Sequence, residues 1–116
     1  MVFNNLTFGS IRIDGTEYDY DIVVDRGEIR KRKKGPSKAF RSQFGHTPLT
    51  TSEEIPWHCH RLVIGTGIYG RLPIDPDVRR EAERREVELV VVPTEQAVAM
   101  LNEQTSHTNA VLHLTC

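Results

Sequence analysis

The sequence has little of several features that would assign it to a specialised class. It contains only two cysteines, Cys59 and Cys116, which are too few for a disulfide framework and favour a reducing compartment. No apolar run approaches the ~20 residues that a membrane-spanning helix needs, and residues 1–10 show no secretory signal. The formal net charge is −1, so no strong overall field attracts nucleic acid or a membrane. These absences predict a soluble cytoplasmic protein without a membrane partner.

The length of 116 residues predicts a single domain, 1–116, with no internal repeat. Its charges are unevenly distributed, because residues 30–41 carry seven bases and no acid. Such a basic segment could contact the phosphates of nucleic acid. However, charge runs are more often solvated loops, and no nucleic-acid-binding motif surrounds this one. The sequence therefore argues against a nucleic-acid partner.

The chain is organised around residues 62–70. Leu62, Val63 and Ile64 form a continuous apolar run, which is typical of a strand buried on both faces. A loop with three glycines follows it, ending at Gly70. Glycines permit positive φ and close backbone approach, and a glycine-rich turn after a buried strand can present several N–H groups to an anion. The stretch therefore predicts a pocket or a tight turn.

The glycines match the G-x-G-x-x-G pattern of dinucleotide-binding sites only in their spacing. Pro73 and Pro76 prevent a helix from starting before Asp75. The dinucleotide fingerprint needs its third glycine inside the helix. We therefore expect either a structural turn or a pocket for another small ligand, and no cofactor.

The N-terminal part predicts antiparallel strands. Residues 8–13 and 18–24 alternate in side-chain character, and the Asp14-Gly15 pair between them is typical of a hairpin turn. In the second of these strands one face is apolar and the other largely acidic, which indicates a sheet with one face in water. A third short strand is expected near Glu28, and residues 51–54 suggest a brief helical turn.

From residue 61 onward, strand and helix patterns alternate. Asp75 fits a helix N-cap with Pro76 at the first helical position, and Thr94 is expected to cap a second helix. Right-handed crossovers then predict a parallel βαβαβ core. The predicted fold class is α/β, a three-layer single domain whose mixed sheet adds an N-terminal antiparallel hairpin to this core. The expected strands are 61–64, 87–92 and 110–114, and the expected helices are 75–85 and 94–102.

The carboxyl ends of the parallel strands define the predicted ligand site, because open α/β sheets bind ligands there. By this rule we expect glycines, hydroxyl groups, a histidine and a helix N-terminus to lie together at one edge of the sheet. No obvious acid–base pair accompanies them, which favours binding over catalysis. The candidate ligand-binding residues are Gly65, Thr66, Gly67, Gly70, Thr94, His113 and Thr115.

Two other groups suggest chemistry less strongly. In an extended segment His58 and His60 would share a face while Cys59 points away. A closed zinc site needs four ligands at workable spacing, so we expect a surface cluster and no metal. Cys116 and His113 are three residues apart and would lie on opposite faces of a strand, so we expect no catalytic cysteine.

Several motifs, taken in order, resemble a known family. It is the domain of unknown function shared by the mitochondrial NADH dehydrogenase (complex I) assembly factor 3 group and the adipogenesis-associated domain-containing protein, and the chain is most similar to its prokaryotic branch. The matching pieces are Phe8-Gly9-Ser10-Ile11-Arg12-Ile13-Asp14-Gly15, Tyr20-Asp21-Ile22, Gly45-His46-Thr47-Pro48, Ile64-Gly65-Thr66-Gly67 with Gly70, Pro93-Thr94 with Ala97 and Asn102, and His113-Leu114-Thr115-Cys116.

The resemblance implies a three-layer α/β domain with a mixed sheet and an assembly or interaction role. It carries over no catalytic residue and no cofactor. Together with the residues themselves, it predicts a non-enzymatic module that presents the 65–70 edge to a partner protein. The alternative is a small-ligand or anion-binding protein, or an enzyme, that uses a pocket at the same edge.

Overall fold

The computed structural model describes the whole chain, Met1–Cys116. None of its helices is long and apolar enough to cross a membrane. The strands are β1 (Phe3–Thr7), β2 (Ser10–Ile13), β3 (Thr16–Tyr18), β4 (Ile22–Asp25), β5 (Glu28–Lys31), β6 (Arg61–Thr66), β7 (Glu88–Val92) and β8 (Thr108–His113). The helices are the 3₁₀-helix η1 (Gly35–Phe40) and the α-helices α1 (Arg41–Phe44), α2 (Pro76–Arg84) and α3 (Thr94–Glu103).

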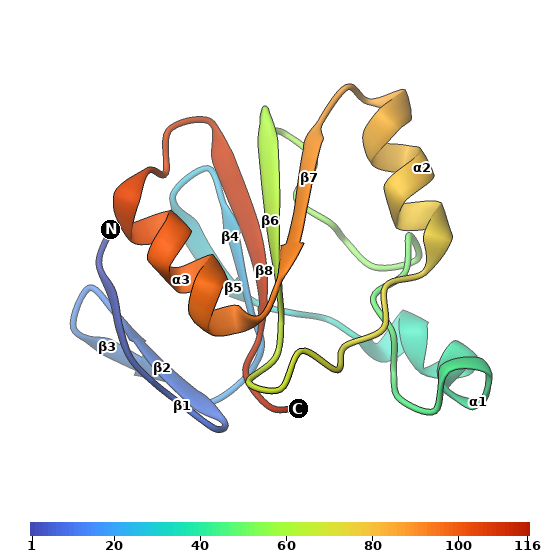
Figure 1. The fold of residues 1–116 in the computed structure, drawn as a ribbon, viewed down its shortest axis with the longest axis horizontal. Helices are drawn as coiled ribbons and strands as arrows, with labels where there is room; N and C mark the ends of the chain where they lie inside the picture. The colour runs from blue at the N-terminus through green and yellow to red at the C-terminus, as the bar shows by residue number, and fades with distance from the viewer.

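These elements form three layers around a five-stranded mixed sheet with the strand order β5-β4-β8-β6-β7. One face of this sheet packs against α3 and a three-stranded antiparallel sheet, β1-β2-β3. Figure 1 shows α2 lying on the side away from α3, where it packs on the other apolar cluster together with the segment that precedes β6. The predicted α/β class, the three layers and the mixed sheet are confirmed.

The parallel core follows the prediction closely. Strand β6 lies between β7 and β8 and pairs with both in parallel. Leu62, Val63 and Ile64 are fully buried, as a strand covered on both faces requires. Helix α2 begins where Asp75 accepts a hydrogen bond from the Asp77 N–H at 2.9 Å, which confirms the expected N-cap.

The prediction of one continuous second strand in the N-terminal hairpin is wrong. The segment expected to run from 18 to 24 breaks into β3, which stays in the small sheet, and β4, which pairs with β8 in the large one. The break lies at residues 19–21, where the Arg32 N–H donates to the Asp21 carbonyl. Val23 is buried, so no face of β4 is wet, because both faces of the large sheet are covered.

Three smaller elements also differ from the sequence-based expectation. Strand β1 was not predicted, since its polar Asn4 and Asn5 hide the pattern. The basic segment 30–41, expected to be a solvated loop, begins in β5, forms η1 and ends at the first residue of α1. Residues 51–54 form a turn rather than a helix, with the Glu53 N–H donating to the Thr50 carbonyl at 3.2 Å.

Candidate functional site

The predicted ligand-binding residues do meet at the carboxyl ends of the parallel strands. The Gly67 N–H donates to Thr94 Oγ1 at 2.8 Å, and the same hydroxyl donates to the His113 carbonyl at 2.6 Å. The Ile68 N–H donates to the Thr115 carbonyl at 2.7 Å. The turn after β6, the start of α3 and the segment after β8 are therefore held together by hydrogen bonds.

The inside of this turn is filled by the chain itself. A Cβ atom on Gly67, whose φ is +109°, would lie 2.3 Å from the Cys116 carbonyl carbon. A Cβ atom on Gly65 would lie 2.8 Å from Thr94 Oγ1. Gly70, with a φ of +67°, faces Pro93 at an ordinary contact distance. Two of the glycines are thus required by the close approach of other segments.

The threonine hydroxyls at the turn are also engaged internally. Thr66 Oγ1 donates to the Val92 carbonyl at 3.1 Å, and both Thr66 and Thr94 are buried. Thr94 is the first residue of α3, whose N-cap is Pro93 with no side-chain cap hydrogen bond. The expected capping role of Thr94 is therefore wrong, because its hydroxyl joins the turn to β8 instead.

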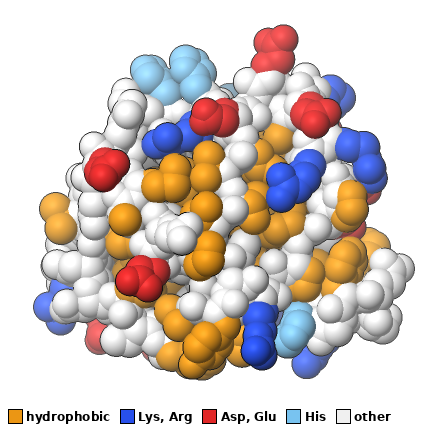
Figure 2. All heavy atoms as spheres, in the orientation of Figure 1, with side chains coloured by type: hydrophobic (Ala, Val, Ile, Leu, Met, Phe, Trp, Pro, Cys, Tyr) orange, Lys and Arg blue, Asp and Glu red, His pale blue; other side chains and the backbone are white.

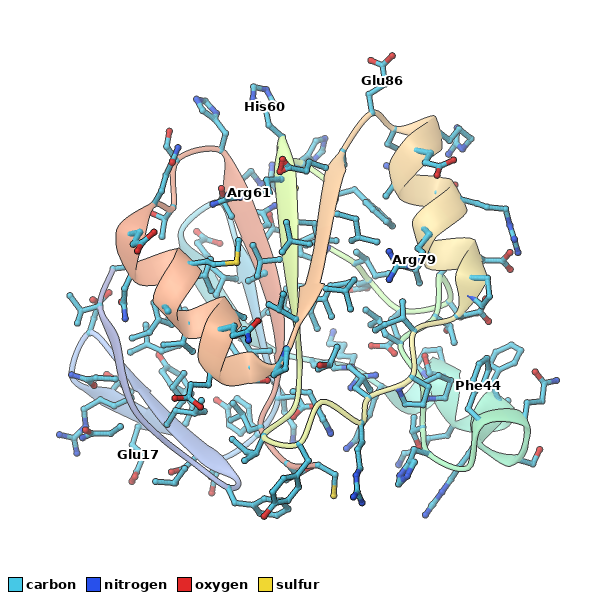
Figure 3. The ribbon with its side chains drawn as sticks, in the orientation of Figure 1. Glu17, Phe44, His60, Arg61, Arg79 and Glu86 are labelled. Carbon is cyan, nitrogen blue, oxygen red and sulfur yellow. The ribbon has the colours of Figure 1, made fainter.

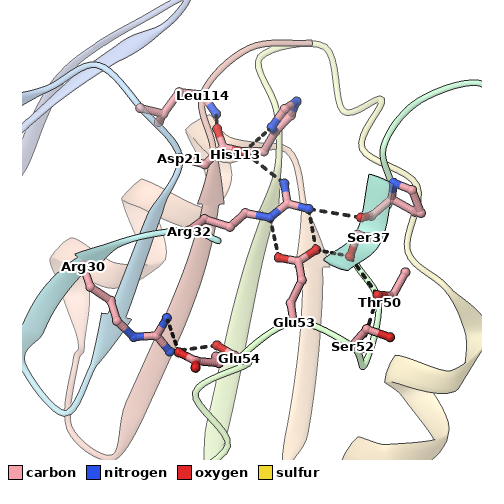
Figure 4. A network of polar contacts seen from close by, with 11 residues as sticks. Asp21, Arg30, Arg32, Ser37, Thr50, Ser52, Glu53, Glu54, His113 and Leu114 are labelled. Atoms are coloured by element: carbon pink, nitrogen blue, oxygen red, sulfur yellow. Dashed lines mark hydrogen bonds and ion pairs between the residues drawn. The ribbon is translucent and has the colours of Figure 1, made fainter. Parts of the chain in front are cut away.

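His113 reaches a different environment, which Figure 4 shows. Its Nδ1 lies 2.7 Å from Asp21 Oδ2, and its Nε2 lies 3.3 Å from Thr115 Oγ1. The other carboxylate oxygen of Asp21 accepts the Leu114 N–H at 2.9 Å. Burial by itself raises the pKa of Asp21, but the hydrogen bond and charge of His113, the Leu114 N–H and the charge of Arg32 together lower it below its usual range.

Arg32 links this group to the basic segment (Figure 4). Its guanidinium donates to both carboxylate oxygens of Glu53 at 2.8 Å and to Asp21 at 3.0 Å. Burial acts to lower the pKa of Arg32, but the hydrogen bond and charge of Glu53, followed by those of Asp21, raise it above its ordinary value. The buried Ser37 hydroxyl donates to Glu53 and lies 2.7 Å from Thr50 Oγ1. This network fixes η1 against the body of the protein.

A basic pocket of about 360 Å³ opens beside the glycine turn. Its lining includes His113 and Thr115, which are predicted ligand-binding residues, and cationic side chains that were not predicted to take part. The signals that could have found these were the basic segment 30–41 and the Gly45-His46-Thr47-Pro48 motif. The pocket is lined by Arg32, Lys34, Lys38, Arg41, His46, Thr47, Arg71, Leu72, His113, Thr115 and Cys116.

An exposed aromatic pair lies on the outer side of the same turn. The rings of Phe8 and Tyr69 have centroids 6.1 Å apart, and the two residues are 56% and 65% exposed. The Arg71 guanidinium lies 5.9 Å from the centroid of the Tyr69 ring. Figure 2 shows hydrophobic side chains gathered at the lower rim of the molecule with cationic side chains beside them. The turn at residues 65–70 therefore keeps the Thr66 hydroxyl inside and exposes the Tyr69 ring.

The histidines of the His58-Cys59-His60 group lie at the opposite end of the sheet, where Figure 3 labels His60. This segment is a bend that precedes β6, and all three residues line a hollow of about 610 Å³. His60 stacks on His107 with ring centroids 4.7 Å apart. Burial raises the pKa of the Cys59 thiol. No three His, Cys, Asp or Glu side chains of the chain form a group that could hold a metal ion.

A family model described as protein of unknown function (DUF498/DUF598) matches residues 3–114. The chain is similar to the solved structure of the conserved hypothetical protein PH1505 from Pyrococcus horikoshii OT3, with 29% identity, a TM-score of 0.81 and 100% of both chains covered. It is also similar to the solved structure named MT938, with 26% identity, a TM-score of 0.73 and coverage of 99% of this chain and 98% of that chain. A Bordetella pertussis protein described as an Mth938-like domain shares the fold at 14% identity and a TM-score of 0.63, with 97% and 85% of the two chains covered. No curated protein matches the chain.

Proposed function

The chain belongs to the family of proteins of unknown function DUF498/DUF598, the family that its motifs indicated, and we propose that it acts as a non-enzymatic interaction or assembly module. Its contact surface is the outer side of the 65–70 turn. We call this surface the aromatic face and define it by Phe8, Ile68, Tyr69 and Arg71. The proposal gives the exposed aromatic pair a role that the packing of the domain does not require.

The observation that carries the proposal is the exposure of Phe8 and Tyr69 side by side. Protein interfaces are enriched in aromatic and arginine side chains, and these types dominate their energetic hot spots. Residues 8 and 69 come from distant parts of the chain, and the fold brings them into contact. Beside them lies a hollow of about 320 Å³, which is lined by Leu6, Thr7, Phe8, Ile68 and Glu95. Its three apolar residues offer a contact for an apolar side chain of a partner protein.

The positive charge next to the aromatic pair indicates which residue types the partner presents to it. The Arg71 guanidinium lies over the Tyr69 ring and forms no ion pair with any carboxylate of this chain. Arginine pairs well with carboxylates through two parallel hydrogen bonds. The proposed partner segment therefore places an apolar side chain on the Phe8–Tyr69 pair and an aspartate or glutamate on Arg71.

The alternative function is a small ligand held by the N–H groups of the turn itself. It has less support than the interaction role, because the N–H groups of Gly67, Ile68 and Gly70 all donate hydrogen bonds within the chain. An anion at the inner side of the turn would have to displace the segment that ends at Cys116. A thermal-shift screen of the wild-type chain and Thr66→Val would detect such a ligand.

The interaction role is tested by comparing two sets of variants. The double variant Phe8→Ser/Tyr69→Ser removes the aromatic pair, and Tyr20→Ser removes an aromatic that is 37% exposed elsewhere. Binding partners captured by the wild-type chain are purified and titrated against each variant by calorimetry. Each hot-spot side chain should contribute about 2 kcal/mol, so the double variant should lose roughly a thousandfold in affinity, while Tyr20→Ser should bind as the wild type does.

Sedimentation of the purified chain provides the complementary measurement. A concentration-dependent dimer lost in the double variant would make the aromatic face a contact between two copies of this chain, which overturns the proposed heterologous partner. The proposal also fails if every captured protein binds the double variant as tightly as the wild type, or if the wild-type chain captures no protein that the double variant does not.

A further inference from the structure

The basic segment 30–41 is folded so that four of its side chains line the basic pocket. They are Arg32, Lys34, Lys38 and Arg41, and Arg71, His46 and His113 join them from three other segments. No residue of this set belongs to the aromatic face except Arg71. The proposed interaction role therefore leaves this convergence unexplained.

The segment is held in place by buried hydrogen bonds and is not a solvated arm. Ser37 is fully buried in the middle of η1, where it contacts Glu53 and Thr50. Arg32 fixes the start of the segment by donating to Glu53 and to the Pro48 carbonyl. Buried polar groups that are fully paired define one arrangement of the chain. The lysines and Arg41 are thus carried by a rigid support.

The charges in the pocket do not cancel. The charge of Arg32 is offset by Glu53 and Asp21, but Lys34, Lys38, Arg41 and Arg71 form no ion pair within the chain. No aspartate or glutamate lines the pocket. A concave site lined by one sign of charge concentrates the field and attracts ions of the opposite sign.

We propose that the basic pocket binds a small phosphorylated molecule through its phosphoryl group. Arginine forks match the oxygens of a phosphate, and lysines supply point charges to it. His113 Nε2 and Thr115 Oγ1 lie 3.3 Å apart and add hydrogen-bonding groups to the lining of the pocket. The volume of about 360 Å³ suits a ligand of metabolite size.

The test measures binding of defined probes to the full chain at low salt by calorimetry and ³¹P NMR. The probes are inorganic phosphate, glucose 6-phosphate, citrate as a phosphate-free polyanion, and a short single-stranded RNA. The variant Lys38→Gln/Arg41→Gln removes two exposed cations of the pocket. The matched control Lys33→Gln/Arg79→Gln removes one lysine and one arginine that do not line it and form no ion pair.

Saturable binding of either phosphate probe is expected, with a loss of about tenfold or more in the pocket variant and little change in the control. Tighter binding of glucose 6-phosphate than of inorganic phosphate would identify a phosphate ester as the ligand, and the reverse would identify free phosphate. Equal losses in both variants, citrate binding as tightly as the phosphates, RNA binding more tightly than either, or no saturable binding would each overturn the proposal. Because Phe8 and Tyr69 are unchanged in these variants, failure here leaves the interaction role to its own test.

Discussion

Gly67 lies directly against the backbone of Cys116, and a Cβ atom at position 67 would come within 2.3 Å of the Cys116 carbonyl carbon. The same glycine has a φ of +109°, which side chains other than glycine rarely adopt. This contact explains why a glycine-rich turn follows β6 even though the chain itself fills the inside of the turn. It makes residue 67 the most restricted position of the candidate site.

Replacing Gly67 by alanine should destabilise the protein by roughly 3 kcal/mol, because overpacking against a backbone segment adds to the strain of a positive φ. Urea denaturation of Gly67→Ala and Gly70→Ala measures the difference. Gly70 also has a positive φ, but its nearest neighbour would lie 3.5 Å from a Cβ atom, so Gly70→Ala should cost only about 1 kcal/mol. Similar losses in the two variants would contradict the close packing of Cys116 on the turn.

Thr94→Val should destabilise the protein by roughly 3 kcal/mol, since it leaves both the Gly67 N–H and the His113 carbonyl without a partner. Thr94→Ser keeps the hydroxyl and should cost about 1 kcal/mol, chiefly for the lost methyl group. Thermal or urea denaturation of the two variants gives the comparison. A Thr94→Val variant as stable as Thr94→Ser would show that the hydroxyl does not join α3 to the turn.

Asp21→Asn should lower stability at pH 7 by roughly 2 kcal/mol, because the carboxylate accepts hydrogen bonds from charged and backbone donors. The pKa of Asp21 is lowered in the folded protein, so its contribution is present above the unfolded pKa of about 3.9 and is lost as the pH falls through the folded pKa. The difference in the free energy of unfolding between the wild type and Asp21→Asn should therefore reach its full size at pH 7 and shrink below about pH 4.

The matched control for this prediction is Asp19→Asn. Asp19 is exposed and takes part in no ion pair, so its variant should match the wild type at every pH. Urea titrations between pH 3 and pH 7 (about 25 °C) separate the two. A constant difference for Asp21→Asn across this range would mean that its carboxylate is not stabilised by the fold.

Ser37→Ala should loosen the basic segment without changing its charge. The variant removes the donor to Glu53 and the contact with Thr50, which should cost about 2 kcal/mol. Amide hydrogen exchange should increase in residues 35–44 more than in the β-sheet, and phosphate binding at the basic pocket should weaken. Ser52→Ala, which changes an exposed serine nearby, should change neither. Unaltered exchange in Ser37→Ala would contradict the role of the buried network as a support.

The sequence predicted the elements whose patterns are local. The apolar run before Gly65, the Asp75 cap with Pro76, and the valine-rich strand ended by Pro93 each carry their own signal. Their alternation then fixed the parallel core through the handedness of crossovers. Strand β1 was missed because Asn4 and Asn5 hide its alternation. The break between β3 and β4 was missed because it depends on which sheet each segment joins.

The sequence could predict that the candidate residues meet at one edge, but not which hydrogen bonds they form there. The rule for parallel strands placed Gly67, Thr94 and His113 at one edge, and the structure brings all three together. The sequence could not show that the Thr94 hydroxyl faces inward, nor that Lys38 and Arg41 come to lie near His113. Both facts depend on how segments distant in the chain pack on one another.

By itself, then, the sequence determined the family, the α/β class and the edge at which the parallel strands end, because periodicity, capping and glycine signals act over a few residues. Only the tertiary structure decided what that edge offers to the outside. Buried hydroxyls at the turn are paired within the chain because an unpaired polar group is costly to bury. The tertiary structure also places Phe8 beside Tyr69. The hydrogen bonds of Ser37 and Arg32 to Glu53 hold the basic segment in place, so that its side chains line a pocket.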